Sequence, residues 1–134
     1  MIPFRRVQIA LAGFALFLVS LVILADSGHG GRLFQLANTI PFGDKVGHLM
    51  LFGTLSFLLN LRLGGAELRV FAGRMLQGSA LILPVVTLEE CSQVLFRARS
   101  FDLLDLAADV AGIWLCGRLA VRCLNWKRGP RPRV

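Results

Sequence analysis

The longest predominantly apolar run lies near the start of the chain, from Val7 to Ala25, with Gln8 and Ser20 as its polar positions. It contains no charged residue, and as a helix it is long enough to cross a hydrocarbon core of about 30 Å. Arg5 and Arg6 precede the run, as basic residues do in a signal peptide. The run is longer than the apolar region of such peptides, however, and no small-residue cleavage pattern follows it. The pattern therefore predicts a retained transmembrane helix over residues 7–25.

Three further apolar runs follow, and each is shorter than a solitary span requires or is interrupted by polar residues. Their charges fall near the ends, so each run can still cross a membrane when its polar face points toward the other helices. We expect helices over residues 46–63, 70–90 and 103–124, the second of them kinked at Pro84. Loops are expected at 26–45, 64–69 and 91–102, with a short interfacial helix over 33–37. The predicted fold class is an all-α integral membrane bundle of four transmembrane helices.

The composition and the distribution of charge agree with a membrane protein. Hydrophobic residues make up 55% of the chain, charged residues only 17%, and the mean hydropathy is +0.66. The net charge is +7, but the basic residues cluster beside apolar runs, as topology signals do, rather than on a nucleic-acid-binding surface. Basic segments at 1–6, around the 64–69 loop and at 125–134 fall on one side, and most acids fall on the other. The positive-inside rule therefore predicts cytoplasmic N- and C-termini.

Polar and charged residues recur at helical spacing at the ends of three of the expected helices. Residues 44 and 48 share one face, as do residues 90, 93 and 97, and residues 102, 105 and 109. All three stripes lie at the same expected depth, near the outer surface, where exposure to lipid is unfavourable. We therefore expect them to face one another across a pocket open to the outside, with Gly53 and Gly112 as close-packing positions between helices. No metal ligand or cofactor is assigned, and the candidate binding residues are Asp44, Lys45, His48, Glu90, Gln93, Arg97, Arg99, Asp102, Asp105 and Asp109.

Two motifs in this part of the chain resemble signatures of the VanZ-like family. The segment DKVGHLMLFGTL, from Asp44 to Leu55, is similar to D-K-x-x-H followed by an apolar helix. The second signature is E-x-x-Q, then an arginine, then D-x-x-x-N-x-x-G, and the similar residues here are Glu90, Gln93, Arg99, Asp105, Asp109 and Gly112. The resemblance covers about residues 44–117, and it departs from the family at Asp109, where asparagine is usual. It implies a small multi-pass protein of the bacterial cytoplasmic (inner) membrane, with a link to resistance against the glycopeptide teicoplanin.

These features favour a non-enzymatic membrane protein whose outer pocket binds a lipid head group, anionic or zwitterionic, or a lipid-linked cell-envelope intermediate. Arg97 and Arg99 would hold a phosphate or carboxylate, because the guanidinium group suits bidentate contacts. The acids would orient these arginines and accept hydrogen bonds from hydroxyl or amine groups. The expected partners are therefore membrane lipids or lipid-linked envelope intermediates rather than nucleic acid, and oligomer formation is left open.

Three alternatives remain at this point. The first is a membrane enzyme that modifies a glycolipid or phospholipid, with His48 as general base or nucleophile oriented by Glu90 or Asp105. In that case the acids and the histidine could also hold a hard divalent cation, although no G-x-S-x-G or HExxH motif is present. The second is a structural module in which the polar stripes only join helices. The third is transport, which with four short spans requires an oligomer.

Overall fold

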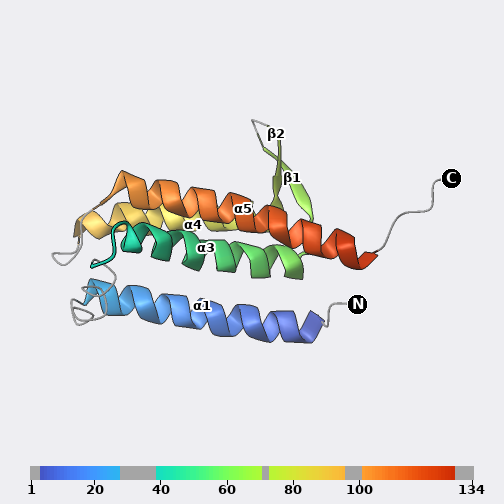
Figure 1. Cartoon of the computed structure of the whole chain (residues 1–134), viewed down its shortest axis with the longest axis horizontal. Helices are drawn as coiled ribbons and strands as arrows, with labels where there is room; N and C mark the ends of the chain where they lie inside the picture. The colour runs from blue at the N-terminus through green and yellow to red at the C-terminus, as the bar shows by residue number, and fades with distance from the viewer. Residues whose placement is uncertain (1–3, 28–38, 71–72, 96–100, 129–134) are drawn as a thin grey trace.

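The computed structural model of the 134-residue chain shows four helices and one small hairpin among the residues that it describes (Figure 1). It describes residues 4–27, 39–70, 73–95 and 101–128. The helices are α1 (Phe4–Asp26), α3 (Gly43–Arg62), α4 (Gln77–Ser92) and α5 (Leu103–Arg128), with a 3₁₀ turn η1 (Gln93–Leu95) after α4. The predicted helical fold is confirmed, whereas the interfacial helix expected over residues 33–37 lies outside the described residues.

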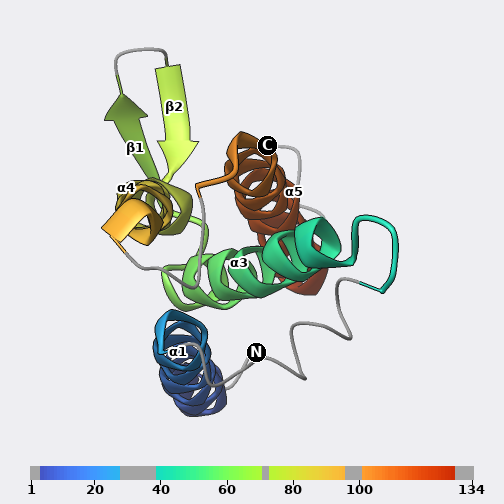
Figure 2. The same ribbon diagram turned by 90° about the vertical axis from the view of Figure 1, so that its left-hand side faces the viewer.

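Successive helices run in opposite directions along one axis, so that α1 begins and α5 ends at the same end of the bundle (Figure 1). Helix α3 lies between α1 on one side and α4 and α5 on the other (Figure 2). The guanidinium carbon of Arg62, at the end of α3, lies 5.2 Å from the ring centroid of Phe4 at the start of α1. This cation–π contact joins neighbouring ends of the two antiparallel helices.

The described helices bury several polar side chains beside a small apolar core that includes Val86 and Ile113. Four of the five largest fully buried side chains are polar or charged: Glu90, Asn60, Asp109 and Ser56. Large apolar side chains lie on the outside instead, among them Leu16, Val85 and Leu104 on three different helices. In the described residues, two helical segments are long and apolar enough to cross a membrane, Phe4–Asp26 and Gln77–Leu95. These two segments are candidate membrane spans, and the large apolar side chains on the outside of the helices agree with contact with lipid.

Two glycines allow α3 and α5 to approach closely. A Cβ atom added to Gly112 would overlap the backbone carbonyl of Leu49, and one added to Gly53 would lie 2.8 Å from the sulfur of Cys116. Small residues at such crossings are typical of helix packing in membranes. The predicted close-packing role of Gly53 and Gly112 is confirmed.

A buried polar network joins α3, α4 and α5 in the half of the bundle where α3 ends. Ser56 donates a hydrogen bond to the carbonyl oxygen of Ile113 at 2.9 Å. The amide nitrogen of Asn60 donates to the hydroxyl oxygens of Ser56 and Ser79, and its Oδ1 accepts from the backbone N–H of Gly78 at 3.0 Å. These contacts satisfy polar groups that would otherwise be unpaired inside the bundle.

The segment before α4 differs from the sequence prediction. The helix expected over residues 70–90 begins at Gln77, and it then continues through Pro84. Strands β1 (Glu67–Val70) and β2 (Gly73–Leu76) instead form an antiparallel hairpin that projects sideways from the bundle (Figures 1 and 2). Gly65 and Gly73 have positive φ angles, which end α3 and start β2 in conformations that other residues rarely adopt. The hairpin therefore lengthens the expected 64–69 connection at the expense of the third helix.

Candidate functional site

Lys45, in the first turn of α3, is surrounded by carboxylates from two helix ends. Its Nζ lies 2.8 Å from Asp44 Oδ2, 2.5 Å from Asp102 Oδ2 and 2.8 Å from Asp105 Oδ1. The contact between Lys45 and Asp105 is an ion pair that lacks hydrogen-bond geometry. The buried Oδ1 of Asp105 therefore accepts no hydrogen bond. The hydrogen bond from Lys45 holds the pKa of Asp102, which precedes α5, below its usual value. Lys45 therefore ties the start of α3 to the start of α5.

Asp102 also determines where α5 begins. Its Oδ1 accepts a hydrogen bond from the backbone N–H of Leu104 at 2.8 Å, which is the contact of an N-terminal helix cap. Its own backbone N–H donates to Glu90 Oε1 at 3.0 Å. The first residue before α5 is thus fixed to both α3 and α4.

His48 lies one turn further into α3 and is paired with α5. Its Nδ1 is 3.1 Å from Oδ1 and 3.2 Å from Oδ2 of Asp109, whose side chain is fully buried. A proton on Nδ1 would be donated to the carboxylate and would fix the orientation of the ring. The partner of His48 is therefore Asp109, and the prediction that Glu90 or Asp105 orients it is wrong.

Glu90, near the end of α4, is also fully buried. Its Oε2 accepts a hydrogen bond from the amide nitrogen of Gln93 at 2.6 Å, and its Oε1 accepts the bond from Asp102. Gln93 approaches Glu89 as well, at 3.4 Å from each carboxylate oxygen. The spacing of Glu90 and Gln93 that marked one helical face in the sequence thus produces a direct contact, even though α4 gives way to a 3₁₀ turn there.

Two groups of these side chains have the spacing of cation ligands. One ligand atom from each of His48, Glu90 and Asp109 lies within 4.8 Å of the others, and the same is true of Asp44, Asp102 and Asp105. The second group already surrounds the ammonium group of Lys45. In the described part of this end of the bundle, carboxylates outnumber cationic side chains, so the site is suited to amines, hydroxyl groups or metal cations.

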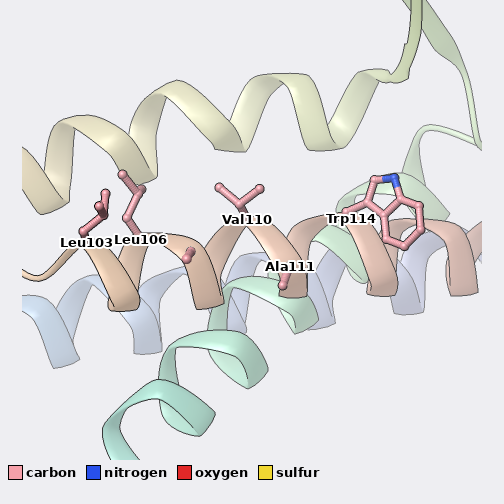
Figure 3. A pocket seen from close by; sticks show the side chains of 6 residues that line it. Leu103, Leu106, Val110, Ala111 and Trp114 are labelled. Atoms are coloured by element: carbon pink, nitrogen blue, oxygen red, sulfur yellow. The ribbon is translucent and has the colours of Figure 1, made fainter.

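An apolar groove begins next to the polar cluster. It is a shallow, open groove of about 460 Å³ on one helix, and its lining residues are Leu103, Leu106, Ala107, Val110, Ala111 and Trp114 of α5. The side chains of Leu103, Leu106 and Val110 point toward α4 in Figure 3. Because Leu103 directly follows Asp102, the groove extends from the charged end of the bundle along α5.

The structure brings together all the candidate binding residues that it describes. The other two candidates, Arg97 and Arg99, lie outside the described residues. Sequence reasoning missed the groove and the buried network around Asn60. The network did leave a signal, since Ser56 and Asn60 stand four residues apart in an otherwise apolar run, on the face of Phe52. The groove left none, because its residues are ordinary apolar positions of a membrane helix.

Comparison with known proteins adds no relative: no family model, no curated protein and no solved structure matches this chain.

Proposed function

We propose that this protein is a four-span protein of the bacterial inner membrane, with both termini cytoplasmic and the polar cluster near the outer surface. Helix α1, and α4 together with the 3₁₀ turn η1, meet the length and apolarity of a span. Helices α3 and α5 are parallel to them and of at least similar length, and α3 packs between its neighbours (Figures 1 and 2). The arginines of the hairpin and of the end of α5 lie at the end opposite the acids, in agreement with the positive-inside rule.

Within this topology, we propose that the protein binds the head group of a zwitterionic lipid or of an amine-bearing lipid-linked envelope component. The observation that carries the proposal is the continuity of a carboxylate-rich cluster with an apolar groove that starts one residue away, at Leu103. The oxygens of Asp44 and Asp105 that do not contact Lys45 would accept hydrogen bonds from an amine, and the groove would take an acyl chain. A phosphate would contact Arg97 and Arg99, as the sequence suggests.

The resemblance to the VanZ-like family connects this binding to glycopeptide sensitivity. The test is a teicoplanin resistance assay in cells that express the wild-type protein or single alanine variants at Asp44, His48, Glu90, Arg99 and Asp105. Membrane abundance is measured for each variant. We expect lost resistance at normal abundance, because the site and not the fold is altered. Unchanged resistance in all five variants rules out a function at this site.

The pairing of His48 with Asp109 supports a second candidate, an enzyme that acts on the bound lipid. A histidine whose ring is oriented by a buried carboxylate is a common general base. The variant His48→Gln separates the two functions when it is assayed for lipid turnover and for lipid binding. An enzyme loses turnover and keeps binding, whereas a binding protein has no turnover to lose.

A further inference from the structure

Three side chains of types that commonly bind metals lie close together inside the bundle, and each comes from a different helix. His48 comes from α3, Glu90 from α4 and Asp109 from α5, and one ligand atom of each lies within 4.8 Å of the others. Their spacing is therefore set by the packing of helices and not by a loop. We propose that these three residues bind a divalent transition-metal cation, with Mn²⁺ and Zn²⁺ as the chemical types that fit.

The charge at this point favours a cation. Glu90 and Asp109 are both fully buried, and His48 contacts Asp109 through Nδ1, where a protonated ring would form an ion pair. An imidazolium offsets one carboxylate and leaves the second negative charge buried. Buried charges are unfavourable unless they are paired or coordinate a metal. A divalent cation held by two carboxylates and a neutral imidazole gives a centre with no net charge.

The donor atoms and their surroundings narrow the choice of metal. Carboxylates suit Mn²⁺ and imidazole suits Zn²⁺, whereas Ca²⁺ and Mg²⁺ prefer oxygen alone. Zinc ligands lie about 2.0–2.2 Å from the metal, so that two of them are at most about 4.4 Å apart. Small side-chain rotations therefore bring the observed spacing to that of a bound site.

Glu90 is already held in place for such a role. Gln93 donates to its Oε2, and the backbone of Asp102 donates to its Oε1. Each carboxylate oxygen retains a second lone pair, and outer hydrogen bonds of this kind orient metal ligands. The neighbouring group of Asp44, Asp102 and Asp105 is a poorer cation site, because the ammonium group of Lys45 lies among its oxygens.

The experiment titrates purified wild-type protein in detergent, after dialysis against EDTA, with MnCl₂, ZnCl₂ and CaCl₂, and follows binding by calorimetry. We expect one Mn²⁺ or Zn²⁺ per chain and weaker Ca²⁺ binding. Glu90→Gln and Asp109→Asn keep the shape of each side chain and should weaken binding by about 100-fold or more, since loss of outer-shell partners alone weakens metal sites by 10–100-fold. Glu67→Gln is the control: it removes an exposed carboxylate of the hairpin, which has no contact with the three ligands, and should retain nearly wild-type affinity.

A second measurement does not depend on whether the Glu90 and Asp109 variants fold. Pulsed electron paramagnetic resonance of the Mn²⁺-loaded wild-type protein should show coupling to an imidazole nitrogen. That signal should survive His29→Gln and disappear in His48→Gln. Absence of metal binding, absence of the nitrogen coupling, or equal affinity in Glu90→Gln and the wild type overturns the inference.

The inference rests on the proposed function only in placing the cation next to the head group of a bound lipid. Metal binding is measured here without lipid, so the two proposals fail separately. Lipid binding without metal binding overturns the cation site alone, and metal binding without lipid binding overturns the proposed function alone.

Discussion

At the scale of single residues, the site depends on how closely α3 and α5 approach. Gly112 lies against the backbone of Leu49, one residue after His48, and three residues from Asp109. A side chain at position 112 would separate the helices where the His48–Asp109 contact forms. The sequence allowed this role to be predicted, because a glycine stood on the same face as the acids. It did not allow Asp109 to be chosen as the partner of His48, because Glu90, Asp105 and Asp109 have similar expected depths.

We predict that Gly112→Ala lowers the free energy of unfolding by about 1–3 kcal/mol, as overpacking of a tight core does. The measurement is unfolding of the purified protein in detergent, followed by circular dichroism. Gly47→Ala is the matched control, because Gly47 is also in a helix but a Cβ there would meet nothing within 4 Å. This control should change stability by no more than about 1 kcal/mol. Equal effects of the two substitutions would contradict the close packing at Gly112.

At the scale of elements, two polar regions hold α3, α4 and α5 together. One is the charged cluster, and the other is the network of Ser56, Asn60 and Ser79 nearer the opposite end. The charged cluster was predictable because charges in apolar runs are conspicuous. The hairpin was not, since β1 and β2 are only four residues each and lie beside an apolar run that helical periodicity dominates. The alternation of polar and apolar residues in β1 and β2 is too short to outweigh the helical periodicity of the neighbouring run.

Asn60→Ala should destabilise the bundle by about 1–3 kcal/mol, because it leaves the buried N–H of Gly78 without its acceptor. Chemical unfolding in detergent measures the difference. The control is Ser20→Ala on α1, whose exposed hydroxyl group donates only to the carbonyl of Leu16 in its own helix. A neutral Asn60→Ala would mean that the network does not hold the helices together.

At the scale of the whole molecule, the account requires that α3 crosses the membrane. Its two ends would then lie on opposite sides, with the charged cluster outside and the hairpin inside. The large apolar side chains on the outside of the helices support this arrangement, and the four helical segments were predictable from the apolar runs. The groove on α5 could not be predicted, because its lining residues are ordinary apolar positions of one helix.

Cysteine labelling tests this topology in a background without the three native cysteines. Ile40→Cys, before α3, should react with a membrane-impermeant maleimide in intact cells. Glu67→Cys, in the hairpin after α3, should react only after lysis. Both positions are exposed in the structure, so that the difference reports the membrane and not burial. Labelling of both sites from the same side would contradict a crossing α3.

The central claim is that the charged cluster and its groove bind a lipid, and binding of phosphatidylethanolamine to delipidated protein tests it most directly. Native mass spectrometry should detect one bound lipid per chain for the wild type and equally for Glu67→Gln, which alters an exposed carboxylate in the hairpin. Asp105→Asn should bind about tenfold more weakly or worse at an unchanged unfolding temperature, since hydrogen bonds to charged groups contribute about 1.5–3 kcal/mol. Equal affinities for all three proteins would contradict the account.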